Sequence, residues 1–107
     1  MNRNHAIPPL TAADQQMTIV TLVAGALLRA SLSQVDPMWV LSASLQALAC
    51  PELEVRWAAV MALGHLVRRY RHIDINPIVT AVTPLREDPR LTGKVDDLLG
   101  DITIIRT

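Results

Sequence analysis

Apolar residues recur at intervals of three and four along most of this chain, the spacing that places them on one face of a helix. No stretch shows the alternation of apolar and polar residues that indicates a β-strand. Proline is favoured at the first position of a helix, and Pro37, Pro51, Pro77 and Pro89 stand at breaks in the spacing. The pattern predicts five helices, over residues 11–31, 37–49, 51–71, 77–83 and 89–102.

Pro84 is the one local misfit, because it follows directly on the apolar spacing of the fourth predicted helix. A proline in a helix interior removes a backbone hydrogen bond and clashes with the preceding turn. We therefore expect the fourth helix to kink or to end near Thr83, with Leu85 still turned toward the core.

The second and third predicted helices resemble the fourth and fifth in order and in sequence. Leu41 corresponds to Ile78, 37 residues later, and the Leu-Gly pair that begins at Leu63 recurs at Leu99. This spacing lies in the range of helix-pair repeats that stack into solenoids. The offsets differ slightly along the repeat, so the paired helices differ slightly in length.

These observations predict one all-α domain over residues 11–107, preceded by a loosely ordered arm over residues 1–10. The expected architecture is a short α-solenoid of five helices, with a half repeat followed by two helix pairs. The predicted core contains Leu27, Leu45, Leu48, Val55, Leu63, Leu66, Val82, Leu98 and Ile102.

Composition and charge narrow the class of protein. Half of the 107 residues are apolar, yet there is no Phe, so the core must be aliphatic. Ten basic and ten acidic side chains cancel, which argues against a general nucleic-acid or membrane-surface binder. The longest apolar run, residues 17–28, is too short to span a bilayer. The single cysteine, Cys50, cannot form an internal disulfide, which favours a reducing compartment.

The third predicted helix carries a strip of side chains opposite its apolar face, spaced at helical intervals. A Trp and a Met that point away from the main apolar face have two explanations. Either they pack against a neighbouring helix, or they form a partner-binding strip of the residue types that dominate interface energies. The strip consists of Trp57, Met61, His65, Arg68 and His72.

The third predicted helix is basic and the fifth is acidic. In a helix-pair stack these two helices are equivalent and lie side by side, so Asp97 and Asp101 should lie near the strip. The opposite charges either pair with each other, each exposed pair contributing about 0–1 kcal/mol, or they form a split-charge surface that recognises a complementary partner.

The sequence offers little for catalysis or metal binding, and we expect no enzyme activity, no cofactor and no metal. His65 and His72 lie seven residues apart, which is about 10 Å along a helix and too far for one metal ion. Asp97 and Asp101 are spaced four apart, but no nucleophile or phosphate-binding loop accompanies them. We expect Cys50 to be a buried, unreactive residue.

Several segments resemble a group of small bacterial HEAT-repeat proteins, and the resemblance covers residues 36–102. Its most specific part is residues 54–66. Pro84, the tail after Ile102 and the neutral net charge depart from the pattern. The segments that carry the resemblance include Asp36-Pro37-Met38-Trp39-Val40, Glu54-Val55-Arg56-Trp57-Ala58-Ala59 and Leu63-Gly64-His65-Leu66.

Members of that group look like immunity proteins of polymorphic toxin systems, including contact-dependent growth inhibition. The resemblance implies a cytoplasmic protein that binds and blocks a cognate toxin C-terminal domain. One alternative is a HEAT-like adaptor that joins two host proteins. A second is a solenoid enzyme of the DNA-alkylation-repair type, which fits poorly because such enzymes are about twice as long and need a strongly basic face.

Overall fold

A computed structural model describes residues 11–33 and 36–105 of the chain, and within these ranges every regular element is helical. The predicted all-α fold is therefore confirmed, whereas the predicted arm over residues 1–10 lies outside the described residues. The elements are α1 (Ala12–Leu32), α2 (Pro37–Ala47), α3 (Leu53–Arg69), α4 (Asn76–Val82), the 3₁₀ helix η2 (Thr83–Glu87) and α5 (Thr92–Ile105).

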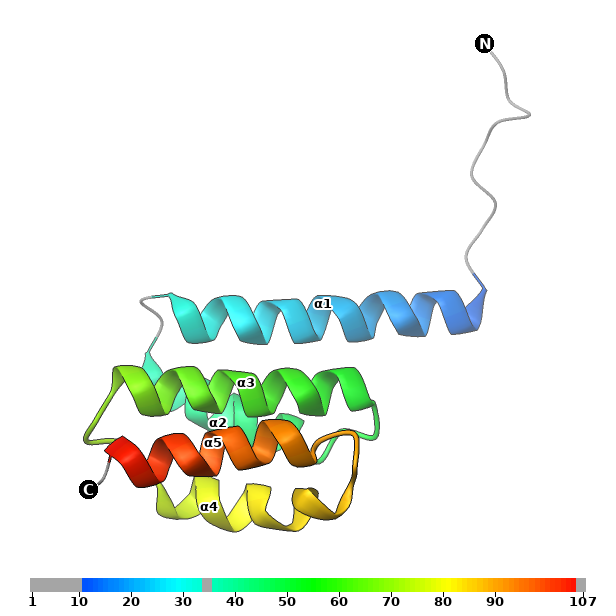
Figure 1. The fold of residues 1–107 in the computed structure, drawn as a ribbon. Coiled ribbons are helices and arrows are strands. Elements are labelled where there is room, and N and C mark those ends of the chain that lie inside the picture. The colour runs from blue at the N-terminus through cyan, green and yellow to red at the C-terminus, as the bar shows by residue number, and fades with distance from the viewer. Residues whose placement is uncertain (1–10, 34–35, 106–107) are drawn as a thin grey trace.

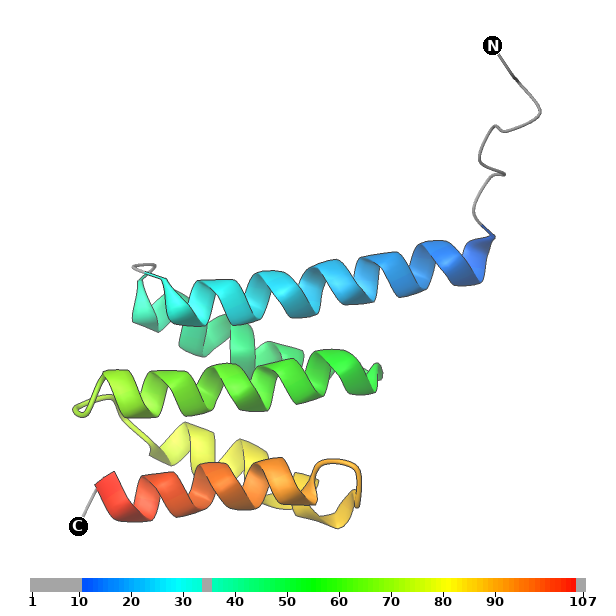
Figure 2. The ribbon, with the colours of Figure 1, turned by 45° about the horizontal axis from the view of Figure 1, so that its top comes forward.

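The helices form two layers (Figures 1 and 2). One layer consists of α1, α3 and α5, which lie side by side with α3 in the middle. The other consists of α2 and α4, which lie behind them. Because α3 contacts α1, α2 and α5, it is the central element of the molecule. The expectation that the third and fifth helices lie side by side is confirmed.

Local capping explains most of the helix boundaries. The N–H of Met38 donates to the Asp36 carboxylate at 2.9 Å, and Pro37 occupies the first turn of α2. In contrast, α5 begins three residues after Pro89 rather than at it, because residues 88–91 form a separate turn. In that turn the N–H groups of Leu91 and Thr92 both donate to the carbonyl of Asp88.

The expectation for Pro84 is confirmed. The α-helix ends at Val82, and the chain continues as the 3₁₀ helix η2, in which Pro84 lies in the first turn. Proline is tolerated there because the first N–H groups of a helix have no partner within it. Leu85 is half-buried and packs against the core, as expected.

The core is aliphatic and centred on α3, where Leu63 and Val67 are completely buried. Eight of the nine predicted core residues are buried, but Leu45 is only half-buried and packs at the edge of the core. Other fully buried side chains come from every layer. They include Val40, Val60, Ile78, Leu91 and Val95.

Each of α1, α3 and α5 carries a glycine that follows an apolar residue. The pairs Leu63-Gly64 on α3 and Leu99-Gly100 on α5 have a counterpart on α1 at Ala24-Gly25. In α1 and α3 an arginine four residues after the glycine lies over it. A Cβ atom added at Gly25 would lie 3.1 Å from Arg29 Nη1, and one added at Gly64 would lie 3.3 Å from Arg68 Nη1.

A groove between α3 and α5

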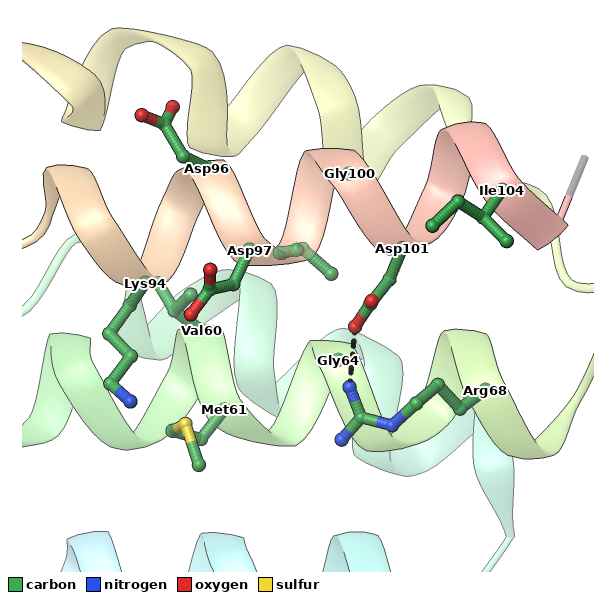
Figure 3. A pocket seen from close by; sticks show the side chains of 11 residues that line it. Val60, Met61, Gly64, Arg68, Lys94, Asp96, Asp97, Gly100, Asp101 and Ile104 are labelled. Carbon is green, nitrogen blue, oxygen red and sulfur yellow. Dashed lines mark hydrogen bonds and ion pairs between the residues drawn. The ribbon is translucent and has the colours of Figure 1, made fainter.

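The candidate functional site is a groove between α3 and α5 on the open side of their layer (Figure 3). Its volume is about 500 Å³. Apolar and polar atoms form similar shares of the groove wall, so the groove offers a partner both apolar contact and charged groups. The residues that line it are Val60, Met61, Gly64 and Arg68 from α3, and Lys94, Asp96, Asp97, Leu98, Gly100, Asp101 and Ile104 from α5.

An ion pair crosses the groove. Arg68 Nη1 donates to Asp101 Oδ2 at 2.7 Å, and both side chains remain partly exposed (Figure 3). The guanidinium reaches Asp101 by lying over Gly64, where a larger residue would crowd it. This contact supports the interpretation that the basic and acidic helices pair with each other at this point. Since the pair is exposed, it contributes about 0–1 kcal/mol to folding.

The remaining carboxylates of the groove differ in their surroundings. Asp96 points away from α3 and accepts a 2.6 Å hydrogen bond from Arg86 Nε of η2. Asp97 is exposed, points into the space between the two helices, and makes no hydrogen bond or ion pair with the described residues. Asp97 is therefore the carboxylate of the groove that remains available to a cation from outside.

Trp57 is half-buried and packs against the hydrophobic core. Lys94 Nζ of α5 lies 5.3 Å from the centre of its ring, within the range of a cation–π interaction. Trp57 thus helps to join α3 to α5, which favours the packing interpretation for this residue. Met61 is also half-buried, but its side chain lines the groove (Figure 3).

His65 is turned toward α1 instead of the groove. Its Nδ1 lies 2.9 Å from the hydroxyl of Ser31, which is buried. The Ser31 hydroxyl also lies 2.7 Å from the carbonyl of Leu28, so Ser31 links α3 to the last turn of α1, and the tautomer of His65 sets which atom donates. Burial, and to a smaller extent the nearby Arg68 guanidinium, lower the pKa of His65 below its ordinary value.

His72 does not belong to the strip in which the sequence placed it. The predicted third helix extends to Tyr70 or Arg71, but α3 ends at Arg69, so the helical spacing no longer applies at residue 72. His72 instead lines a second, mainly apolar pocket of about 480 Å³ at the end of the molecule near the start of α2. The other residues of this second pocket are Pro37, Met38, Arg69, Tyr70, Arg71 and Ile73.

The structure brings four of the seven predicted site residues to one groove: Met61, Arg68, Asp97 and Asp101. Sequence reasoning missed Lys94, Ile104 and the two glycines of the groove. The repeated Leu-Gly pair was the available signal, because Gly64 leaves room for the Arg68 guanidinium and Gly100 leaves open space beside it. A Cβ atom added at Gly100 would meet nothing within 4 Å.

The described residues hold no cluster of three or more His, Cys, Asp or Glu that could bind a metal ion. The expectation that Cys50 is buried is wrong, because Cys50 lies in the turn between α2 and α3 and is only half-buried. Among the same residues no helix is long and apolar enough to cross a membrane. What the groove presents to a partner is the exposed carboxylate of Asp97 beside the apolar side chains of Met61 and Leu98. No protein-family model, curated protein or solved structure matches this chain.

Proposed function

We propose that this protein is a non-enzymatic binding protein, built as a short HEAT-like α-solenoid, and that it acts in the cytoplasm as an immunity protein for a cognate toxin domain. The observation that carries the binding role is the groove between α3 and α5, where the exposed carboxylate of Asp97, which pairs with none of the described residues, lies beside apolar surface. The toxin as partner rests on the HEAT-repeat resemblance of residues 36–102.

The charges of the groove suit a partner that presents a cation. Lys94 is engaged by the Trp57 ring, and Asp101 is paired with Arg68. Asp97 is left to accept a lysine or arginine from the partner, while Met61 and Leu98 offer apolar contact beside it. A central apolar contact with a charge at its side is the usual arrangement of a specific interface.

The first test is genomic: the immunity role expects a toxin C-terminal domain to be encoded immediately upstream of the gene for this chain, and that domain is the partner to use. Co-expression of the native protein should restore growth of cells that produce the toxin domain, and Asp97→Arg should abolish this protection because it replaces the free carboxylate by a repelling cation. Glu87→Arg is the matched control, since Glu87 is exposed on η2 outside the groove. Failure of the native protein to bind and protect would contradict the immunity role.

One observation favours the alternative of an adaptor that joins two host proteins. The second pocket is separate from the groove, and its apolar floor is bordered by Arg71 and His72, which are exposed and make no ion pair within the described ranges. An adaptor would use both surfaces at once. Substitution of Met38 by Glu should then remove one partner and leave binding at the groove intact, whereas an immunity protein that uses the groove alone would be unaffected.

A further inference from the structure

The second pocket differs from the groove in the character of its wall. Polar and apolar atoms form similar shares of the groove wall, whereas the second pocket, of about 480 Å³, is mainly apolar. It lies where α3 ends and α2 begins, and its apolar side chains are those of Pro37, Met38, Tyr70 and Ile73. Pockets that bind small molecules have volumes in this range and combine apolar walls with a few polar groups.

A tight turn after α3 shapes the pocket. The chain leaves α3 at Tyr70, whose backbone is extended, and the N–H of Ile73 donates to the carbonyl of Tyr70 at 3.1 Å. Ile73 is buried, whereas Arg71 and His72, the two middle residues of this turn, are exposed. The turn therefore places an apolar side chain in the wall of the pocket and two polar side chains at its border.

Among the described residues, every charged side chain that lines the pocket is basic. The lining includes Arg69 and Arg71 but no carboxylate. The nearest carboxylates along the chain, those of Asp36 and Asp74, lie outside the lining, and each accepts the backbone N–H two residues farther on. Arg71 is exposed and makes no ion pair within the described ranges. The border of the pocket thus offers a guanidinium to an anion from outside.

The Arg69 guanidinium is fixed at the same border. It donates to the carbonyl of Ser33 at 2.7 Å and lies 5.6 Å from the centre of the Tyr70 ring. A guanidinium carries five N–H donors, so this contact leaves others for a second acceptor. The carbonyl is neutral, so the positive charge of Arg69 is not compensated by it, in contrast to Arg68, which is paired with Asp101.

An apolar wall bordered by cations selects a ligand with a hydrocarbon group and an anionic group. A segment of peptide would bring backbone N–H and C=O groups against a wall with few polar atoms, and each unpaired buried group costs free energy. A small molecule brings its hydrocarbon group without such polar groups. A carboxylate accepts two parallel hydrogen bonds from one guanidinium, which favours a carboxylate as the anionic group at Arg71.

We propose that the second pocket binds a small amphiphilic carboxylate. Its hydrocarbon group lies against the apolar wall and its carboxylate accepts from Arg71, with Arg69 as a second positive charge. This ligand site does not depend on the proposed function, because the pocket shares none of its described lining residues with the groove. Both sites can therefore be occupied in one molecule.

The test is a titration of the isotope-labelled full chain with sodium octanoate, followed through the backbone N–H signals in NMR spectra. Signals of Met38 and residues 69–73 should shift and saturate, whereas those of residues 94–101 in the groove should stay in place. Octylammonium has the same hydrocarbon chain and the opposite charge. It should bind about fivefold more weakly or not at all, because the pocket is bordered by cations.

Charge reversal at the border gives the sharper measurement. Arg71→Glu should weaken octanoate binding about fivefold and make octylammonium the tighter ligand, because it exchanges the guanidinium for a carboxylate. Arg86→Glu is the matched control, since Arg86 is an exposed arginine on η2 at the opposite end of the molecule (Figure 1), and it should change neither dissociation constant. Met38→Glu tests the apolar wall independently, because a carboxylate on this exposed side chain should also weaken octanoate binding.

Four results would overturn the proposal. These are shifts that do not saturate, shifts confined to the exposed apolar residues of α1, equal affinity for octanoate and octylammonium, and an Arg71→Glu variant that binds octanoate as the native protein does. A capped tripeptide of two leucines and one glutamate carries the same charge and comparable apolar groups on a peptide backbone. It should bind more weakly than octanoate, and tighter binding would assign the pocket to a segment of a protein partner instead.

Discussion

The two long helices α1 and α3 show that the more apolar helix is not the more buried one. Only two charged residues, Asp14 and Arg29, occur along α1, whereas α3 carries Glu54 and three arginines. Nevertheless, nine of the 17 residues of α3 are buried, while α1 leaves Ile19, Leu22 and Val23 largely exposed. Burial follows from the number of neighbours: α3 packs against helices on three sides, and α1 lies at the end of its layer.

The largest expected difference between the two helices is in core stability. Leu63 of α3 is completely buried, so Leu63→Ala should lower the free energy of unfolding by about 2–5 kcal/mol. Leu22→Ala on α1 removes the same atoms from a 61% exposed side chain and should change it by less than about 0.5 kcal/mol. Urea unfolding measures both changes. Equal losses would contradict the difference in burial.

The two tryptophans test whether α3 uses Trp57 for packing or for binding. Trp57 packs against the core and holds Lys94, so Trp57→Ala should lower the free energy of unfolding by about 2 kcal/mol, below the range for fully buried aromatics. Trp39 on α2 is 57% exposed, and Trp39→Ala should cost less than about 0.5 kcal/mol. Thermal unfolding would be measured beside affinity for the toxin domain. Weaker binding with unchanged stability would instead show that Trp57 is an interface anchor.

The stability of the folded protein should depend on pH through His65, which joins α3 to α1. Because burial lowers the pKa of His65, the unfolded chain binds more protons than the folded one as the pH falls through 6.5, the ordinary value. The folded state should therefore lose stability on acidification and regain it above neutral pH. His65→Gln should reduce this dependence of Tm on pH, whereas His72→Gln, at an exposed position outside the helices, should keep it. Equal slopes in the native protein and His65→Gln would contradict the assignment.

The smallest change in the free energy of unfolding is expected from substitution of Arg29 and Arg68, which lie over the glycines of α1 and α3. Arg68→Glu breaks the exposed pair with Asp101 and should lower the free energy of unfolding by up to about 1 kcal/mol, less at high salt. It should also slow association with a partner that docks on the groove. Arg29→Glu is the control, because Arg29 has no ion pair among the described residues. A larger loss from Arg29→Glu than from Arg68→Glu would contradict the assignment of this effect to the pair between Arg68 and Asp101.

Helix number, order and approximate bounds could all be predicted from the chain, because they depend on local signals. Asp36-Pro37 and Asn76-Pro77 mark helix starts, and Pro84 ends an α-helix whatever surrounds it. Local signals failed where a turn replaced the first residues of a helix, as at Pro89, and where α3 ended before His72. That early end removed His72 from the predicted strip.

The candidate site was predictable only in part. Helical spacing placed Met61 and Arg68 on one side of α3, and the repeat placed Asp97 and Asp101 beside them. Spacing alone could not tell that His65 would meet Ser31, 34 residues earlier, or that Lys94 would lie over Trp57. These contacts join separate helices, so they depend on the packing of the layer.

The sequence by itself determined that this chain is helical and that its core is aliphatic. These properties follow from apolar spacing and proline positions, which act within a few residues of the backbone. The tertiary structure decided which apolar residues are buried, because α1 and α3 both carry apolar sides but only α3 has helices against each of them. It also decided that Asp101 meets Arg68 whereas Asp97 meets no cation among the described residues, since a charge is neutralised only when packing brings a partner within reach.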